Sequence, residues 1–342
     1  MALLRATDLG TVYKKGEDLK KVIKKILITG ANGMIGTAIV QEMINKYQLI
    51  LVDAYTNRIE KYLGRATIVK NDFIKVSEWQ DMLDDVYCVV HLAAAVHWVP
   101  KTKEEQKEFI QTNAIGTKLL YKACVEHDVE KFLFFSTNDV YHSSDKLITE
   151  ATVTAPKGIY GESKFLAEEY LREASLKSKT AVCIFRPASV YGANDKGSMR
   201  SLIGLCKKGI VPVIGKGENK KALLYLKDIV RAVDLYITGE NDLNGEIFNI
   251  SSGNYEYKKI IETICSSYRL KPIRVYIPAW FCKRIASKIA PLKKLAVAGE
   301  VKAVSNDKAF KMLGFAGKYS LEEGLADAKD YYMGFPASLK QK

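Results

Sequence analysis

The sequence predicts an α/β protein: a Rossmann-type, doubly wound parallel sheet with a smaller mixed α/β C-terminal lobe. Three observations predict this fold. Short apolar runs alternate with amphipathic helical segments, which is the pattern of βαβ units. Residues 86–92 form a nearly continuous apolar run, as expected of a strand buried on both faces. A glycine-rich turn joins the first strand to the first helix, as in dinucleotide-binding folds.

The alternation starts after a polar extension and can be followed for about 160 residues. Strands are expected at 25–29, 49–52, 66–69, 86–92, 131–135 and 180–185, and helices at 34–46, 104–127 and 160–177. Two later strands, 223–226 and 246–250, are expected to return to the main sheet. We therefore divide the chain into an extension (1–24), a Rossmann domain (25–187 plus 223–250) and a lobe (188–222 plus 251–335).

The composition narrows the range of partners. The chain has 342 residues and a net charge of +13, which favours anionic ligands. Its lysines lie in short pairs such as Lys20-Lys21 and Lys207-Lys208, which indicates a solvated basic surface and no nucleic-acid tract. The six cysteines and four histidines show no metal-ligand spacing, so no metal site is expected. The lack of a signal-like or membrane-spanning apolar run predicts a cytoplasmic protein without stable membrane insertion.

The basic composition also allows two functions that need no catalysis. The positive charge would also suit a non-catalytic Rossmann module that senses NAD or binds RNA; salt-dependent binding to nucleic acid would favour it. Residues 280–295 mix apolar and basic side chains, as a helix lying on a membrane surface does. Pro291 interrupts that pattern, so we favour an ordinary lobe helix there.

The glycine-rich turn reads Gly30-Ala31-Asn32-Gly33-Met34-Ile35-Gly36, a G-x-x-G-x-x-G spacing between the first strand and the first helix. Glycine allows a tight turn, a close approach of the backbone to a pyrophosphate, and close packing of helix on strand. The free N–H groups at the helix N-terminus favour the phosphate charge. A strand before the motif and a helix after it raise its specificity above that of an isolated glycine pattern.

Asp53 ends the second predicted strand, where a carboxylate can accept hydrogen bonds from ribose hydroxyls. The same negative charge repels a 2′-phosphate, so NAD is expected in preference to NADP. Arg58 lies five residues later and would soften that preference. The alternative is that Asp53 serves only as a turn or cap residue; its place in the motif favours the binding role.

Tyr160 and Lys164 form a Y-x-x-x-K pair on one face of a predicted helix. A lysine cation beside a phenol lowers the pKa of the phenol, which would let Tyr160 exchange a proton near neutral pH. Thr137 lies at the end of a predicted strand and can donate a hydrogen bond to a substrate oxygen. Alone the pair is a common accident, but the preceding dinucleotide motif and hydroxyl-rich strand end favour a catalytic set of Thr137, Tyr160 and Lys164.

Taken together, the motifs of nearly the whole chain after Lys24 resemble the extended short-chain dehydrogenase/reductases, in their nucleotide-sugar epimerase/dehydratase branch. Six further motifs carry the resemblance: Asn71-Asp72-Phe73, His91-Leu92-Ala93-Ala94-Ala95, Asn113-Ala114-Ile115-Gly116-Thr117, Val140-Tyr141, Tyr160-Gly161-Glu162-Ser163-Lys164, and Arg186-Pro187 with Val190-Tyr191-Gly192. The resemblance implies that the Rossmann domain binds NAD and that the lobe binds a nucleotide sugar.

The resemblance also implies roles for single residues. Asp72 and Phe73 would lie beside the adenine, Leu92 and Ala93 to Ala95 along the cofactor groove, and Pro187 near the nicotinamide amide. Asn113 would brace the active-site helix, and Tyr160 and Lys164 would also contact the cofactor. The substrate side would be formed by Thr137, Asn138, Ser189, Lys196 and Lys221.

The segments 195–199, 217–221 and 224–228 extend the likeness to small UDP-hexose 4-epimerases and 4-keto-reductases of polysaccharide pathways, with three departures. Lys221 stands where many relatives grip the nucleotide diphosphate with arginine, and Ser189 where galactose-type epimerases often have asparagine. Dehydratases of this branch carry Asp-Glu after the catalytic threonine, whereas this chain has Asn138-Asp139. Asparagine cannot act as an acid, so dehydration is disfavoured; Asp139 leaves a decarboxylase open, although those enzymes usually have glutamate there.

The resemblance therefore implies an NAD-dependent UDP-hexose 4-epimerase. Carbon 4 is oxidised, the keto-sugar turns in its pocket, and the hydride returns to the other face. The alternative is a 4-keto-reductase that uses NAD(P)H once per turnover on a nucleotide-linked 6-deoxy sugar. An epimerase retains its NAD, whereas a reductase consumes its cofactor stoichiometrically. A homodimer is compatible with either activity.

Overall fold

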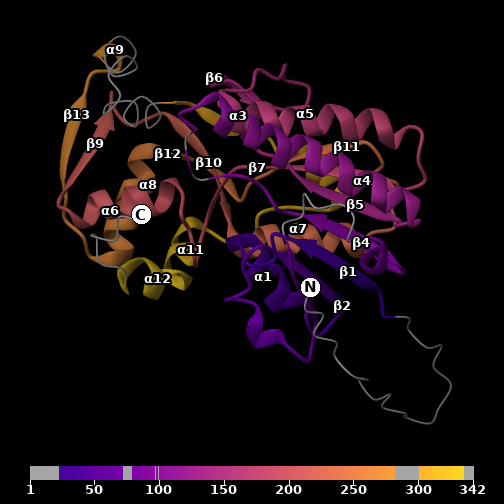
Figure 1. Cartoon of the computed structure of the whole chain (residues 1–342). Coiled ribbons are helices and arrows are strands. Elements are labelled where there is room, and N and C mark those ends of the chain that lie inside the picture. Colours follow the sequence, from indigo (N-terminus) through magenta and orange to yellow (C-terminus); the bar gives the residue numbers. More distant parts are fainter. Residues whose placement is uncertain (1–22, 72–78, 97, 99, 282–299, 335–342) are drawn as a thin grey trace. The chain divides into compact units, whose positions relative to one another are not determined.

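The computed structural model describes residues 23–71, 79–96, 98, 100–281 and 300–334 (Figure 1). Most of the expected N-terminal extension, together with Asp72 and Phe73, lies outside these residues, as does most of the 280–295 segment. The chain forms two compact units. Unit 1 comprises Met1–Val140, Pro156–Phe185 and Tyr236–Ile247, and unit 2 comprises Tyr141–Ala155, Arg186–Leu235 and Phe248–Lys342.

The main sheet has seven strands in the order β11-β7-β5-β4-β1-β2-β3 (Figure 1). Its strands are β1 (Lys25–Thr29), β2 (Gln48–Asp53), β3 (Thr67–Lys70), β4 (Val86–His91), β5 (Lys131–Phe135), β7 (Ala181–Pro187) and β11 (Glu246–Ile250). The pairs from β7 across to β3 are all parallel. The chain first adds β2 and β3 on one side of β1 and then returns to add β4 on the other. This reversal of direction is the switch point of a doubly wound fold, so the predicted fold class is confirmed.

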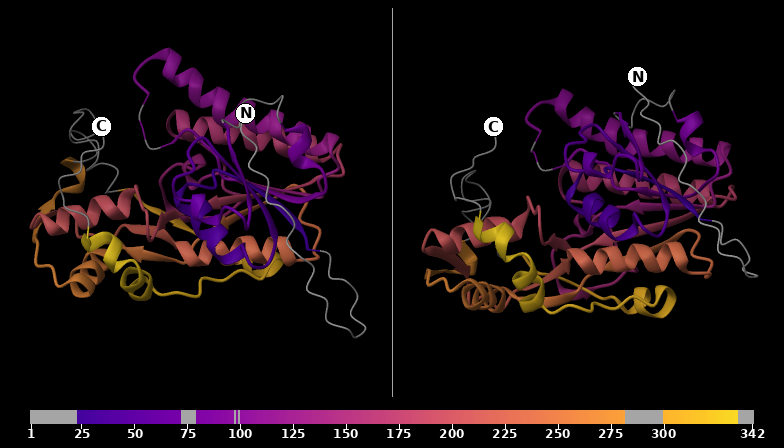
Figure 2. Two further views of the ribbon diagram at one scale, coloured as in Figure 1. Left: turned by 60° about the horizontal axis from the view of Figure 1, so that its bottom comes forward. Right: turned by 90° about the horizontal axis from the view of Figure 1, so that it is seen from below.

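Helices connect these strands. They are α1 (Met34–Met43), η1 (Glu60–Tyr62), α2 (Gln80–Leu83), α3 (Lys103–Ile110), η3 (Gln111–Gly116), α4 (Thr117–Glu126), η4 (Asn138–Val140) and α5 (Gly158–Ser175). Leu120 of α4 and Leu171 of α5 pack with Phe132 of β5 in one core cluster, and all three side chains are fully buried. Figure 2 shows α4 and α5 (magenta) along the sheet. Each such side chain contributes roughly 1.5–3 kcal/mol by burial.

The single helix expected at 104–127 consists of three segments. Between α3 and α4 the backbone forms a π-helical turn, η3. A π turn accommodates one more residue than an α turn and changes which side chains share a face. Apolar spacing does not reveal such a turn, because it preserves a buried face on both sides.

Unit 2 contains two smaller sheets. Strands β12 (Gly253–Glu256), β10 (Lys220–Tyr225), β14 (Lys302–Val304) and β6 (Ser144–Ile148) lie in that order, with β8 (Ser189–Tyr191) paired to β10. Strands β13 (Ile273–Ile277) and β9 (Ile210–Ile214) form a parallel pair. The helices of this part of the chain are α6 (Ser198–Lys207), α7 (Leu226–Thr238), α8 (Tyr257–Tyr268), α9 (Ala279–Phe281), η7 (Ala309–Leu313), α11 (Leu321–Asp327) and α12 (Lys329–Gly334).

One strand prediction is corrected here. Residues 223–226 were expected to rejoin the main sheet, but β10 pairs with β8, β12 and β14 instead. Its burial explains the error. Leu223 and Leu224 are buried in the smaller sheet, and an apolar run looks the same in either sheet. Residues 246–250 do join the main sheet as β11, beside β7.

Candidate active site

The glycine-rich turn follows β1 and leads directly into α1, whose N-cap is Gly33. Gly30 has a φ of +68°, and a Cβ built there would lie 2.7 Å from the backbone nitrogen of Ala93. A Cβ on Gly36 would lie 2.3 Å from the carbonyl oxygen of Gly30. Neither position can hold a larger residue without moving the backbone. The turn therefore presents bare backbone at the N-terminus of α1, the arrangement that suits an anion.

The Asp53 carboxylate closes the other side of this turn. Its Oδ2 accepts a hydrogen bond from the backbone N–H of Asn32 (2.9 Å), and its Oδ1 accepts one from Tyr55 (3.0 Å). Burial raises the pKa of Asp53, and these hydrogen bonds oppose that shift. Each carboxylate oxygen accepts several hydrogen bonds, so Asp53 retains acceptor capacity for a ribose.

The Asn32 side chain supports the loop that follows β2. Its Oδ1 accepts a hydrogen bond from the backbone N–H of Arg58 (2.7 Å), and its Nδ2 donates to Oδ1 of Asn57 (3.0 Å). Asn32 thus connects the glycine-rich turn with the 57–58 loop. The motif spacing did not indicate this contact, because Asn32 and Arg58 are 26 residues apart.

Thr137, Tyr160 and Lys164 lie together in unit 1. Thr137 follows β5, and its side chain forms a hydrogen bond with the Tyr160 hydroxyl. Tyr160 and Lys164 belong to α5, one helical turn apart. Lys164 is fully buried, and its Nζ donates to the carbonyl oxygen of Phe135 (2.7 Å). The sequence-predicted residues therefore meet at the C-terminal end of β5.

The pKa of Tyr160 shifts in the opposite direction to the one expected. Burial raises it, the Asp139 carboxylate raises it further, and the hydrogen bond with Thr137 acts against both. The expected net lowering of the Tyr160 pKa is therefore wrong for the described structure, because the burial of Tyr160 and the Asp139 carboxylate set the direction of the shift. Lys164 is buried as well: burial lowers its pKa to about 7, with Glu168 opposing the shift. Lys164 thus carries only a partial charge at neutral pH.

Asn113 of η3 links the β4 loop to the active-site helix. Its Oδ1 accepts from the backbone N–H of Ala95 (2.8 Å), and its Nδ2 donates both to the Ala95 carbonyl (3.0 Å) and to Ser163 Oγ (2.9 Å). Ser163 in turn donates to the Tyr160 carbonyl (2.9 Å). One buried side chain thereby holds the 93–95 loop to the turn of α5 that carries Tyr160 and Lys164.

His91 is the centre of a buried hydrogen-bond chain. The Thr117 hydroxyl donates to the Asn113 carbonyl (2.7 Å) and therefore accepts from His91 Nε2 (2.9 Å). His91 Nδ1 then accepts from the Thr29 hydroxyl (2.6 Å). Burial, followed by the Lys164 charge, holds the pKa of His91 well below its usual range, in agreement with a neutral ring.

This chain could not be predicted from the sequence, where His91 figured as a possible metal ligand and as the start of the His91–Ala95 motif. Thr29, His91 and Thr117 lie 62 and 26 residues apart, and only the sheet brings them together. The one signal in the sequence was a histidine inside an apolar strand, which needs a hydrogen-bond partner when buried.

The remaining predicted residues are divided between the two units. Leu92 and Ala93 to Ala95 follow β4 in unit 1, half-buried beside the glycine-rich turn, and Asn138 is buried in η4. Pro187, Ser189, Lys196 and Lys221 belong to unit 2. There, Ser189 on β8 pairs with Leu223 on β10, the strand that also carries Lys221, and Lys196 is exposed before α6. Their binding roles stay predictions.

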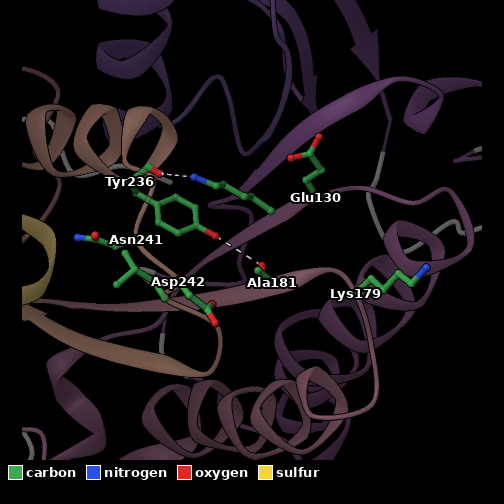
Figure 3. Close-up of a pocket in the computed structure, with 8 residues that line it drawn as sticks. Glu130, Lys179, Ala181, Tyr236, Asn241 and Asp242 are labelled. Atoms are coloured by element: carbon green, nitrogen blue, oxygen red, sulfur yellow. Dashed lines mark hydrogen bonds between the residues drawn. The ribbon is translucent and has the colours of Figure 1, made fainter.

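A separate pocket of about 260 Å³ lies in unit 1 at the opposite ends of the strands (Figure 3). Lys131 and Ala181, the first residues of β5 and β7, line it, whereas Thr137 follows the last residue of β5. Lys131 Nζ donates to the Gly239 carbonyl (2.7 Å) and the Tyr236 carbonyl (3.1 Å) just at the end of α7. The pocket is therefore remote from the catalytic set, and its lysine serves as a helix cap.

The described residues contain no group of three or more His, Cys, Asp or Glu side chains that could hold a metal ion. Among the helices that the structure describes, none is long and apolar enough to cross a bilayer.

Known proteins with similar sequences include nucleotide-sugar enzymes. The model of the family "NAD dependent epimerase/dehydratase" matches residues 26–251. The chain is 26% identical over 324 residues to UDP-glucose 4-epimerase of Vibrio cholerae, covering 92% of this chain and 97% of the relative.

Solved structures give the same result for the fold. UDP-glucuronic acid 4-epimerase of Bacillus cereus in complex with NAD superposes with a TM-score of 0.77 at 21% identity, covering 91% of this chain and 99% of that one. MoeE5 in complex with UDP-glucuronic acid and NAD superposes with a TM-score of 0.74 at 25% identity, with the same coverage.

Proposed function

Because the chain belongs to the NAD dependent epimerase/dehydratase family, we propose that it is a UDP-hexose 4-epimerase that binds NAD. One observation carries the proposal: the Thr137–Tyr160 hydrogen bond beside Lys164, with an amide, Asn138, as the next residue. The relative from Vibrio cholerae, itself a UDP-glucose 4-epimerase, supports the choice of reaction. A cytoplasmic location and a homodimer belong to the same proposal.

The residues around the glycine-rich turn fit a dinucleotide. The bare backbone between Gly30 and Gly36 would receive the pyrophosphate at the N-terminus of α1, and Asp53 would accept the ribose hydroxyls. Leu92 to Ala95 and Pro187 would line the rest of the groove. When bound, NAD supplies the acceptor and donor of the C4 hydride. The Asp53 charge favours NAD over NADP.

Tyr160 exchanges the proton at the C4 oxygen. Its raised pKa keeps it a phenol at neutral pH, which is the form that donates a proton to a 4-keto sugar. Taking a proton from the C4 hydroxyl requires the phenolate, which a nearby positive charge stabilises. Lys164, with a pKa of about 7, gains or loses such a charge within the physiological range. Thr137 donates a hydrogen bond to the same oxygen as charge develops on it.

The amide of Asn138 argues against a dehydratase activity. An amide is far too weak an acid to protonate a leaving hydroxyl, so the acid that dehydration needs is missing from this position. Substrate contacts beyond the sugar ring are assigned to unit 2, where Ser189, Lys196 and Lys221 supply hydroxyl and ammonium groups. The diphosphate of a nucleotide sugar attracts the two lysines, which is consistent with the basic charge of the chain.

The test is to incubate the purified protein with UDP-, GDP-, CDP- and dTDP-sugars and to follow the sugar by NMR. An epimerase converts a UDP-hexose to its C4 epimer with catalytic NAD and no net NADH. Stoichiometric consumption of NAD(P)H with a 4-keto sugar would identify the reductase instead. Formation of a 4-keto-6-deoxy sugar would contradict the argument from Asn138.

A further inference from the structure

The two-stranded sheet of unit 2 has one face that is wholly apolar. Strands β9 and β13 run parallel, with Ile210 opposite Ile273 and Ile214 opposite Ile277. Alternate residues of a strand point to the same side. The register therefore places six apolar residues on one face: Ile210, Pro212, Ile214, Ile273, Val275 and Ile277. On the other face of β9, Val211 and Val213 are buried.

Much of this apolar face is open. Ile210 is 55% exposed, Ile273 68% and Val275 44%, and Trp280 of α9, three residues after β13, is 63% exposed. Figure 1 shows β9, β13 and α9 grouped together. We call Ile210, Ile273 and Val275 the apolar patch; Trp280 is a further exposed apolar side chain, on the helix that follows β13. A cluster of large exposed apolar side chains often marks a surface that contacts another protein or a membrane.

Cations border the patch at one end. Lys208 and Lys271 stand two residues before Ile210 and Ile273, and the parallel pairing brings both to the same end of the sheet. The backbone N–H of Ile273 donates to the Gly209 carbonyl (2.8 Å), which holds the two approaches together. Lys208, Lys271 and the nearby Arg269 are exposed, and none takes part in an ion pair within the described ranges.

We propose that the apolar patch docks the protein on an anionic membrane surface. Isoleucine, valine and tryptophan side chains enter the boundary between headgroups and acyl chains, and unpaired lysines beside them meet anionic headgroups. Tryptophan is the side chain most typical of that boundary. A second copy of this chain is a poorer occupant, because it would bring the same cations against Lys208 and Lys271. The attachment is peripheral and reversible.

Vesicle sedimentation tests the proposal. The full chain is mixed with vesicles of phosphatidylcholine alone and of phosphatidylcholine with one-quarter phosphatidylglycerol. We expect binding to the anionic vesicles at low salt, little binding to the neutral ones, and marked weakening at about 0.5 M NaCl, where charges are screened within a few ångströms. Each Lys-to-Glu change at Lys208 or Lys271 should weaken binding at least about five-fold. Ile273→Ser should weaken it about ten-fold.

Matched variants control for general effects. Leu176 is 82% exposed on unit 1, so Leu176→Ser removes an apolar side chain elsewhere that is even more exposed than Ile273. Lys122 and Lys146 are exposed and remote in sequence, so Lys122→Glu with Lys146→Glu matches the loss of charge at Lys208 and Lys271. These controls should bind anionic vesicles nearly as the wild type does. Epimerase turnover on a soluble nucleotide sugar should be unchanged in every variant, which separates this test from that of the proposed function.

Four results would overturn the proposal. Wild-type protein that ignores anionic vesicles excludes it. Equal losses in the patch variants and the charge-matched control would assign binding to the overall charge. If Ile273→Ser instead converts a dimer to a monomer in light scattering, a second copy covers the patch. If it lowers the melting temperature with no vesicle binding in the wild type, the chain's own residues 282–299 cover it.

Discussion

Lys164 is an ionisable side chain that is only 1% exposed, so its protonation state affects the stability of the fold. Burial lowers its pKa to about 7, whereas the same lysine in an unfolded chain titrates near 10.5. The unfolded state thus binds more protons between these values, so the free energy of unfolding rises as pH increases from 7 to 10.5. Below pH 7 the full cost is present, on the order of a few kcal/mol.

We therefore predict that Lys164→Met is at least as stable as the wild type at pH 7 and loses most of its activity. The stability advantage of the variant should shrink between pH 7 and 10, because the free-energy cost of holding the wild-type lysine neutral in the folded state falls as pH approaches its unfolded pKa near 10.5. Urea unfolding at pH 6, 7 and 9 measures this. A variant that is less stable at every pH would mean that the hydrogen bond to Phe135 outweighs the cost of burying the charge.

Tyr160→Phe removes the proton-exchanging hydroxyl while keeping the ring. We predict that turnover falls by at least about two orders of magnitude, as is typical when a general acid–base is lost, with little change in NAD affinity. Thr137→Val serves as the companion variant, because it removes only the hydroxyl that hydrogen-bonds Tyr160. Normal turnover of the phenylalanine variant would refute the assigned role.

What could be predicted at this scale depended on local spacing. Gly30, Asp53, Tyr160 and Lys164 belong to motifs whose members lie close in sequence, and the structure brings Thr137, Tyr160 and Lys164, the proposed catalytic residues, together as expected. The pKa direction of Tyr160 could not be predicted, because it depends on burial and on Asp139, which only the tertiary fold places nearby. The role of His91 was hidden for the same reason.

Strand β10 provides the prediction at the scale of an element. Lys220 and Lys221 are neighbours on this strand, so their side chains point to opposite faces of the sheet. If Lys221 grips the substrate diphosphate, Lys221→Ala raises KM with a smaller effect on kcat, since that contact is equal in the ground and transition states. Lys221→Arg should be tolerated through a bidentate contact.

Lys220→Ala is the matched control, because it removes the same charge from the other face. If KM rises equally and slightly in both alanine variants, Lys221 makes no specific contact, and the change reflects only the net charge of the protein. The wrong assignment of β10 to the main sheet has a physical reason at this scale. Apolar patterns identify a buried strand, but they do not say which sheet it joins.

At the scale of the whole molecule, cofactor choice is expected to appear as a difference in stability. A ligand that binds only the folded state raises the free energy of unfolding by RT ln(1 + [L]/Kd). Because Asp53 repels a 2′-phosphate, NAD should raise the melting temperature more than NADP at equal concentration. Asp53→Asn should reduce the difference between the two. A larger shift with NADP would point to Arg58 as the deciding charge.

The sequence analysis anticipated the doubly wound sheet because a parallel sheet is built from local βαβ units. The arrangement of unit 2 was less predictable, since its sheets join segments from residues 144–148 to 302–304. The apolar face of β9 and β13 could not be predicted for the same reason. It depends on the register between two strands whose paired residues are more than 60 positions apart in the sequence.

The π-helical turn between α3 and α4 also restricts which insertions and deletions the chain can tolerate. A π turn holds one residue more than an α turn, so deleting one residue from 111–116 would restore a continuous α-helix and leave α3 and α4 in phase. Phe109, now 1% exposed, could then keep its place, whereas Asn113 lies inside the turn and would lose the position from which it binds Ala95. A one-residue gap opposite this turn in an alignment with a shorter homologue would therefore mark a new partner for the Ala95 loop, and not a trimmed surface.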